Sequence, residues 1–215
     1  MKKILIIVDY QNDFVTGSLG FEKAKTLDSK ISNLLNDYLN GTVDGKTEDT
    51  YVFLTMDTHF DDYLKTEEGK NLPILHCKKD TKSWEVYGKT GILLKEYLNN
   101  NPQNKKVEFI CKNTFGSNIL MQKLQQMDKL QISNESKSNS DDTEQMNKAY
   151  YEHNIEEITL VGVVTNMCVI SNAIISKTAC TNSHIIVKKD LCASFDDKLH
   201  DMALEVMKNM HIEIK

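Results

Sequence analysis

The chain lacks several features that would assign it to a well-defined class. Its 215 residues contain no apolar run approaching the 18 residues that a membrane-spanning helix requires. They contain no basic cluster, and the net charge of −5 argues against nucleic acid or an anionic membrane as the main partner. The five cysteines show no CxxC spacing, and their odd number argues against a disulfide framework. Cysteines that form no disulfide framework are typical of a reducing compartment, so we expect a cytoplasmic protein.

The composition is that of an ordinary globular protein, with 40% apolar and 27% charged residues. A chain of this length suits one α/β domain, and no internal repeat or linker divides it, so we expect a single domain over residues 1–215. Residues 133–147 lack aromatic and aliphatic β-branched side chains and cannot bury enough surface to become ordered. We expect this segment to be a mobile surface insertion without a chemical role.

Strand-like and helix-like patterns alternate along the chain. Apolar, β-branched runs predict strands at residues 3–8, 51–56, 107–111, 158–164, 184–189 and 211–214. Helical spacing of apolar residues predicts helices at residues 28–40, 90–100, 117–130, 167–180 and 196–210. Such alternation is typical of parallel strands joined by right-handed crossovers, with helices on both faces of the sheet. The predicted fold is therefore a doubly wound α/β fold.

Cys168 follows the predicted strand at 158–164, and Thr165 and Asn166 between them are residue types that begin helices. This pattern places the thiol in the first turn of a helix. There the amide dipoles favour negative charge and would lower the thiol pKa. A buried cysteine that acts only as a small apolar residue is the alternative.

Two further strand ends carry charged residues. Asp9 follows the apolar run at residues 4–8 directly, and Lys112 follows the strand predicted at 107–111. In a parallel sheet all carboxyl ends lie at one edge, where open α/β folds place their sites. Each charged residue alone is more often a solvated loop residue. Asp9, Lys112 and Cys168 together favour a catalytic group at that edge.

A fourth strand end has the residue types of a metal site. Asp57 and His59 follow the strand predicted at 51–56, and His76 lies beyond a long polar loop. An Asp-x-His pair with a distant histidine is a plausible ligand set for a divalent ion that keeps open positions. Hydrogen-bonded loop histidines are the alternative. Glu68 is a candidate fourth ligand, whereas Cys77 points away from His76 in an extended chain.

These residues together resemble the isochorismatase-like cysteine hydrolases, the superfamily that includes nicotinamidases. The similarity runs from Asp9 to the last predicted helix. The matching motifs lie at residues 8–14, 57–59, 73–77, 112–115 and 162–169. The resemblance implies a three-layer α/β/α sandwich around a six-stranded parallel sheet.

The resemblance also implies roles for individual residues. Asp9, Lys112 and Cys168 would form the catalytic group. A cis peptide between Val163 and Val164 would accompany an oxyanion hole made of the Val164 and Cys168 amides. A divalent metal, which we expect to be zinc, would be bound by residues that share suitable donor atoms: Asp57, His59, His76 and, as a candidate, Glu68.

The substrate implied by the resemblance is a small amide, with nicotinamide as the leading expectation and Phe14 packing against its ring. Leu72 stands where nicotinamidases usually have an aromatic residue, Thr58 where tryptophan is frequent, and Phe115 comes earlier after Lys112 than in most of them. The ring would then be held differently, by Leu72 and Phe115, or the substrate would be another small amide.

The alternatives are a cysteine hydrolase of another amide or carbamoyl compound, an isochorismatase, and a non-catalytic binding module on the same fold. We expect no nucleotide cofactor, because the turn after the first strand contains no glycine-rich phosphate loop. We expect a homo-oligomer. An intact set of Asp9, Lys112 and Cys168 argues against the binding module.

Overall fold

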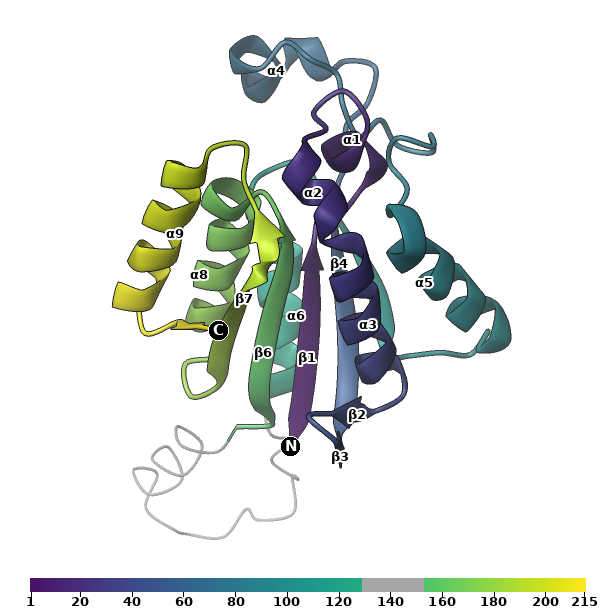
Figure 1. Cartoon of the computed structure of the whole chain (residues 1–215), viewed down its shortest axis with the longest axis vertical. Coiled ribbons are helices and arrows are strands. Elements are labelled where there is room, and N and C mark those ends of the chain that lie inside the picture. Colours follow the sequence, from purple (N-terminus) through teal and green to yellow (C-terminus); the bar gives the residue numbers. More distant parts are fainter. Residues whose placement is uncertain (129–152) are drawn as a thin grey trace, which may run out of the picture.

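Six parallel strands form the central sheet, in the order β5–β4–β1–β6–β7–β8 (Figure 1). A computed structural model describes residues 1–128 and 153–215, so the insertion expected at 133–147 lies outside the described residues. The strands are β1 (Lys2–Val8), β4 (Asp49–Asp57), β5 (Val107–Lys112), β6 (Ile155–Val163), β7 (His184–Ala193) and β8 (Glu213–Ile214). All six predicted strands are confirmed. A small antiparallel pair, β2 (Thr42–Val43) and β3 (Lys46–Thr47), was not predicted.

Helices cover both faces of the sheet and complete a three-layer α/β/α sandwich (Figure 1). Alternate side chains of β1 point to opposite faces: Ile4, Ile6 and Val8 join one apolar core, and Leu5 and Ile7 join the other. The first core includes α6 (Asn118–Asp128), α8 (Ile170–Ala179) and α9 (Asp197–Asn209). The second includes α2 (Glu22–Thr26), α3 (Asp28–Leu39) and α5 (Gly88–Asn100).

The helices predicted near 28–40, 90–100, 117–130 and 196–210 are confirmed as α3, α5, α6 and α9. The helix predicted at 167–180 differs at its start. A π-helical turn, η2 (Thr165–Val169), comes first, and α8 follows it. Three short elements belong to the loops after β1 and β4: α1 (Asn12–Val15), η1 (Tyr63–Lys65) and α4 (Glu67–Asn71). In the part of the chain that the structure describes, no helix has the length and apolar character needed to cross a bilayer.

Gly162 brings β6 unusually close to β1 near the carboxyl edge of the sheet. It pairs with Val8 and has a φ of +116°, and a Cβ at this position would lie 2.2 Å from the Val8 carbonyl oxygen. A larger residue would push the two strands apart. The next two residues, Val163 and Val164, are joined by a cis peptide bond, as the family resemblance implies.

Candidate active site and metal centre

The carboxyl edge of the sheet brings the predicted catalytic residues together. Asp9 follows β1 directly, Lys112 is the last residue of β5, and Cys168 lies in η2 just after β6. Because β1, β5 and β6 run in parallel, their carboxyl ends share one edge. All three side chains are buried at that edge.

Lys112 contacts both other members of the group. Its Nζ lies 2.6 Å from Asp9 Oδ2 and donates to Cys168 Sγ at 3.6 Å. Neither side chain of the ion pair is more than 2% exposed. A lysine in such a place stays charged only because an anion compensates its lost hydration. The contacts therefore form one buried electrostatic unit.

The two oxygens of Asp9 have different surroundings. Oδ1 accepts a hydrogen bond from Thr55 Oγ1 at 2.6 Å. Oδ2 lies 2.6 Å from Lys112 Nζ and accepts no hydrogen bond of good geometry among the described residues. It therefore keeps a lone pair that can accept a proton. Asp9 is therefore suited to act as a base.

Burial and the Asp9 carboxylate raise the pKa of the Cys168 thiol well above its usual value, against the opposing effect of Lys112. Burial also raises the pKa of Asp9, although Lys112 lowers it. The expectation that amide dipoles lower the thiol pKa is therefore wrong, because removal from water outweighs them. Burial thus opposes ionisation of the thiol, and a nearby proton acceptor would favour it.

A second cluster, which we call the ligand cluster, lies beside the catalytic group and consists of Asp57, His59, Glu68 and His76. Asp57 Oδ2 lies 3.1 Å from Nε2 of His59 and 3.1 Å from Nε2 of His76. Glu68 Oε1 lies 3.9 Å from the first of these nitrogens and 3.8 Å from the second. The ligand atoms of the four residues all lie within 4.8 Å of one another. The predicted ligands thus converge, with Glu68 among them.

The donor set fits a divalent metal. His76 Nδ1 lies 2.8 Å from the Ile74 carbonyl oxygen, which can only accept, so Nδ1 carries the hydrogen and the neutral ring keeps its Nε2 lone pair for an ion. Burial opposes ionisation of Asp57, but its close contacts with the imidazoles of His59 and His76 and the charge of Lys112 lower its pKa below the usual range. Two imidazoles and two carboxylates suit zinc and similar ions.

The predicted substrate-binding residues, Phe14, Leu72 and Phe115, differ in how far they are buried and in what they contact. Phe14 is buried, and its ring meets that of His76 edge-on at a centroid distance of 5.6 Å. Leu72 is half-buried, and its carbonyl oxygen accepts a hydrogen bond from Tyr63. Phe115 is 50% exposed. Phe14 therefore contacts the ligand cluster through its ring, and Leu72 contacts it through a hydrogen bond from its backbone amide to the Glu68 carbonyl oxygen at 2.8 Å.

Two further buried polar side chains form hydrogen bonds to backbone atoms of the residues at the carboxyl edge of the sheet. Gln11 Nε2 donates to the Asp57 carbonyl oxygen at 2.9 Å, and its Oε1 accepts from the Asp57 amide at 2.8 Å. Asn172 Nδ2 donates to the carbonyl oxygens of Phe115 and Cys168, at 3.0 and 2.8 Å. Its Oδ1 accepts from the Ser117 amide at 3.1 Å. Asn172 thereby joins the loop after Lys112 to the turn that carries Cys168.

Sequence reasoning missed these supporting residues, although signals were present. Thr55 lies two positions before Asp57 in an apolar strand, and therefore on the same face. Asn172 lies four positions after Cys168 in an apolar helix, and therefore on the same side. Tyr63, whose ring centroid lies 4.5 Å from that of His59 and 5.2 Å from that of His76, had no such signal.

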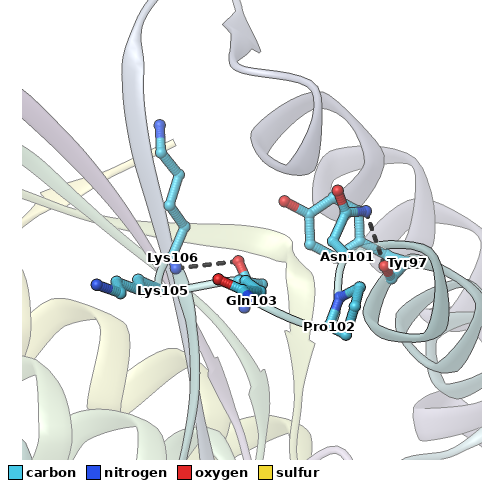
Figure 2. A pocket seen from close by; sticks show the side chains of 7 residues that line it. Tyr97, Asn101, Pro102, Gln103, Lys105 and Lys106 are labelled. Carbon is cyan, nitrogen blue, oxygen red and sulfur yellow. Dashed lines mark hydrogen bonds between the residues drawn. The ribbon is translucent and has the colours of Figure 1, made fainter.

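A surface hollow lies elsewhere, in the loop that leads from α5 into β5 (Figure 2). This loop precedes the amino end of β5, so the hollow lies at the edge opposite the catalytic group. Its lining contains no cysteine, histidine or carboxylate and consists of Tyr97, Asn101, Pro102, Gln103, Asn104, Lys105 and Lys106. The hollow therefore offers none of the nucleophiles or bases that the buried group contains.

Comparisons with known proteins agree with this geometry. The family model described as Isochorismatase domain matches residues 120–214. The chain is 27% identical over 212 residues to the "Uncharacterized isochorismatase family protein PncA" of Bacillus subtilis (strain 168), which covers 97% of this chain and 96% of that protein.

Solved structures show the same fold. The nicotinamidase/pyrazinamidase PncA from Bacillus subtilis superposes with a TM-score of 0.70 at 24% identity, covering 100% of this chain and 99% of that one. The pyrazinamidase of Pyrococcus horikoshii in complex with zinc has a TM-score of 0.64 at 17% identity, covering 99% and 98%. The resemblance deduced from the motifs is thus confirmed: the matching family model is an isochorismatase domain, and the curated relative is an isochorismatase family protein.

Proposed function

We propose that the protein is a cysteine-dependent hydrolase of a small amide, and that nicotinamide, converted to nicotinate and ammonia, is its substrate. One observation carries this proposal. A buried lysine lies 2.6 Å from a carboxylate and 3.6 Å from a thiol, at the carboxyl edge of a parallel sheet. That combination supplies a nucleophile, a base and a compensating charge.

The first half of the reaction forms a thioester. Asp9 Oδ2 accepts the proton of the Cys168 thiol, and the sulfur attacks the amide carbonyl carbon. The tetrahedral oxyanion accepts hydrogen bonds from the backbone amides of Val164 and Cys168. When the C–N bond breaks, Asp9 returns its proton to the departing nitrogen, and ammonia leaves.

The second half releases the acid. Asp9 takes a proton from a water molecule, whose oxygen attacks the thioester carbon. The C–S bond then breaks, the carboxylic acid leaves, and the proton returns to the thiolate. Lys112 keeps its charge throughout, since burial opposes that charge but Asp9, Cys168 and Asp57 raise its pKa above the usual value.

The ligand cluster assists binding. Asp57, His59, Glu68 and His76 would hold a divalent ion, which when bound supplies a Lewis acid that orients the substrate. The zinc complex of the Pyrococcus horikoshii pyrazinamidase supports zinc as this ion. Phe14, in edge-on contact with His76, is placed to pack against a ring held there.

A different small amide or carbamoyl compound is the second candidate. It is favoured by Leu72 in place of an aromatic residue and by Phe115, whose ring is half exposed. Ammonia release from nicotinamide, pyrazinamide and simple carbamoyl amides tests both candidates, with the Cys168→Ala variant as the blank. Release from no amide would refute the amidase proposal, and release from carbamoyl amides alone would refute nicotinamide.

A further inference from the structure

Tyr63 is buried against both imidazoles of the ligand cluster. Its ring centroid lies 4.5 Å from that of His59, with the planes tilted by 60°, and 5.2 Å from that of His76, almost edge-on at 82°. The Nε2 atoms of both histidines lie 3.1 Å from the same oxygen of Asp57. The tyrosine ring therefore restricts the orientation of the two side chains that meet at this carboxylate.

Glu68 is the least firmly held member of the ligand cluster. Its side chain is 25% exposed, whereas those of Asp57, His59 and His76 are 2% to 7% exposed. It belongs to α4, which has only five residues and lies outside both helix layers (Figure 1). Helices so short have little stability of their own in water. The position of the Glu68 carboxylate must therefore depend on contacts that other segments make with α4.

Tyr63 supplies such contacts at both ends of α4. Thr66 caps the start of the helix by accepting from the Gly69 amide at 3.0 Å. The Tyr63 carbonyl oxygen accepts in turn from the Thr66 amide and hydroxyl, at 2.9 and 2.7 Å. At the other end, the Tyr63 hydroxyl donates to the carbonyl oxygen of the C-cap residue Leu72 at 2.9 Å. One residue thus fixes both ends of the helix that carries Glu68.

The charge of Glu68 makes its position important for a bound ion. A divalent cation in a buried site is stable only where anionic ligands compensate its charge. Asp57 is the other carboxylate of the ligand cluster, and its Oδ1 lies 3.8 Å from the Lys112 ammonium, so part of its charge is already compensated. Glu68 therefore supplies much of the negative charge that remains for the ion.

We propose, on the basis of the metal site in the proposed function, that Tyr63 is a positioning residue that holds Glu68 in place as the fourth metal ligand. Its backbone and hydroxyl place the helix of Glu68, and its ring places the two imidazoles. A ligand that is fixed before the ion arrives loses less conformational entropy on binding. Residues that orient metal ligands commonly change the metal affinity by about 10- to 100-fold.

The zinc affinity of the full-length protein, measured by competition with a chromophoric chelator, tests this role. Tyr63→Leu and Glu68→Gln should each weaken zinc binding by about tenfold or more. The double variant should lose less than the product of the two single effects, because Tyr63 acts in part through Glu68. Tyr38→Leu is the matched control, since it replaces another buried tyrosine, on α3, and should leave the zinc affinity unchanged. Circular dichroism verifies that each variant is folded.

Gly69→Ala disturbs the same contact and keeps the tyrosine. A Cβ on Gly69 would lie 2.1 Å from the Tyr63 carbonyl oxygen, so the added methyl group should displace α4. Zinc binding should again weaken by about tenfold or more. This variant replaces Tyr63→Leu if the latter does not fold.

Cobalt(II) in place of zinc gives a second readout, because its visible absorption depends on the number and type of ligands. The cobalt spectra of Tyr63→Leu and Gly69→Ala should resemble that of Glu68→Gln and differ from that of the wild type. Tyr38→Leu should keep the wild-type spectrum, because a general loss of stability does not remove a ligand.

The outcomes separate this role from the metal site itself. A wild-type protein that binds no zinc would refute the metal site and the role of Tyr63 together. Tight binding by the wild type, with near-wild-type affinity in Tyr63→Leu and Gly69→Ala, would overturn only the role of Tyr63. Fully independent effects of Tyr63→Leu and Glu68→Gln would also overturn it, since a tyrosine that only fills space is not coupled to one ligand.

Discussion

Asp57 and Lys112 are paired residues at the ends of the neighbouring strands β4 and β5, and Lys112 Nζ lies 3.8 Å from Asp57 Oδ1. The other oxygen of Asp57 contacts both His59 and His76. One carboxylate therefore lies between the buried lysine of the catalytic group and the imidazoles of the ligand cluster. The charges of the two clusters are coupled through it.

The nucleophile can be tested by substitution. Cys168→Ala should abolish turnover and leave the fold intact, because the change removes little volume. The matched control is Cys111→Ala, since that thiol is exposed. Ammonia release and circular dichroism are the measurements. Appreciable hydrolysis by the alanine variant would exclude Cys168 as the nucleophile.

The base and its partner are tested separately. Asp9→Asn keeps the shape of the side chain but cannot accept a proton, so kcat should fall by about a hundredfold or more. Lys112→Ala leaves two buried anionic groups uncompensated and should reduce kcat at least as strongly. Steady-state kinetics on the best amide give both values. A near-native rate in Asp9→Asn would place the base elsewhere.

The pH dependence of the thiol follows from its surroundings. Burial and the Asp9 carboxylate raise the pKa of Cys168, and Lys112 lowers it. Asp9→Asn removes a negative charge, so the thiol should ionise at lower pH than in the wild type. Lys112→Ala removes a positive charge, so it should ionise at higher pH. Thiolate absorbance at 240 nm, with Cys168→Ser subtracted, measures the shift, and an unchanged or opposite shift in Asp9→Asn would contradict this electrostatic account.

A variant that lacks one imidazole of the ligand cluster should bind less than one equivalent of metal. His59→Ala should reduce the bound zinc measured by elemental analysis of protein purified without added metal or chelator. It should raise KM more than it lowers kcat, because the ion orients the substrate and the thiolate attacks it. Full activity in chelator, with less than about a tenth of an equivalent of metal in the wild type, would refute the metal site.

Asn172 should affect both stability and turnover, although its side chain bonds to backbone atoms around Cys168 and not to the catalytic side chains. Asn172→Ala leaves the Phe115 and Cys168 carbonyl oxygens and the Ser117 amide without this partner, which should cost about 2 kcal/mol or more of unfolding free energy. It should also lower kcat. Thr178→Ala is the control, because that exposed hydroxyl bonds only within α8. Urea denaturation and kinetics test both effects, and near-native values for Asn172→Ala would contradict the supporting role.

Much of the fold could be predicted because it depends on local periodicity. Buried parallel strands read as apolar runs and surface helices as a 3.6-residue repeat, and neither signal requires knowledge of contacts. The order of the strands and the membership of each helix layer were not predicted from the patterns. They depend on which faces pack together, as the alternating side chains of β1 show.

The sequence by itself determined which residues stand at strand ends, and therefore that Asp9, Lys112, Cys168 and the metal ligands share one edge. Only the tertiary structure decided the electrostatics of that edge. A helix start alone would favour a thiolate, but full burial beside Asp9 favours the protonated thiol. The reason is physical: desolvation depends on every atom packed around a group, most of them far away in the sequence, whereas spacing reports only the nearest neighbours along the chain.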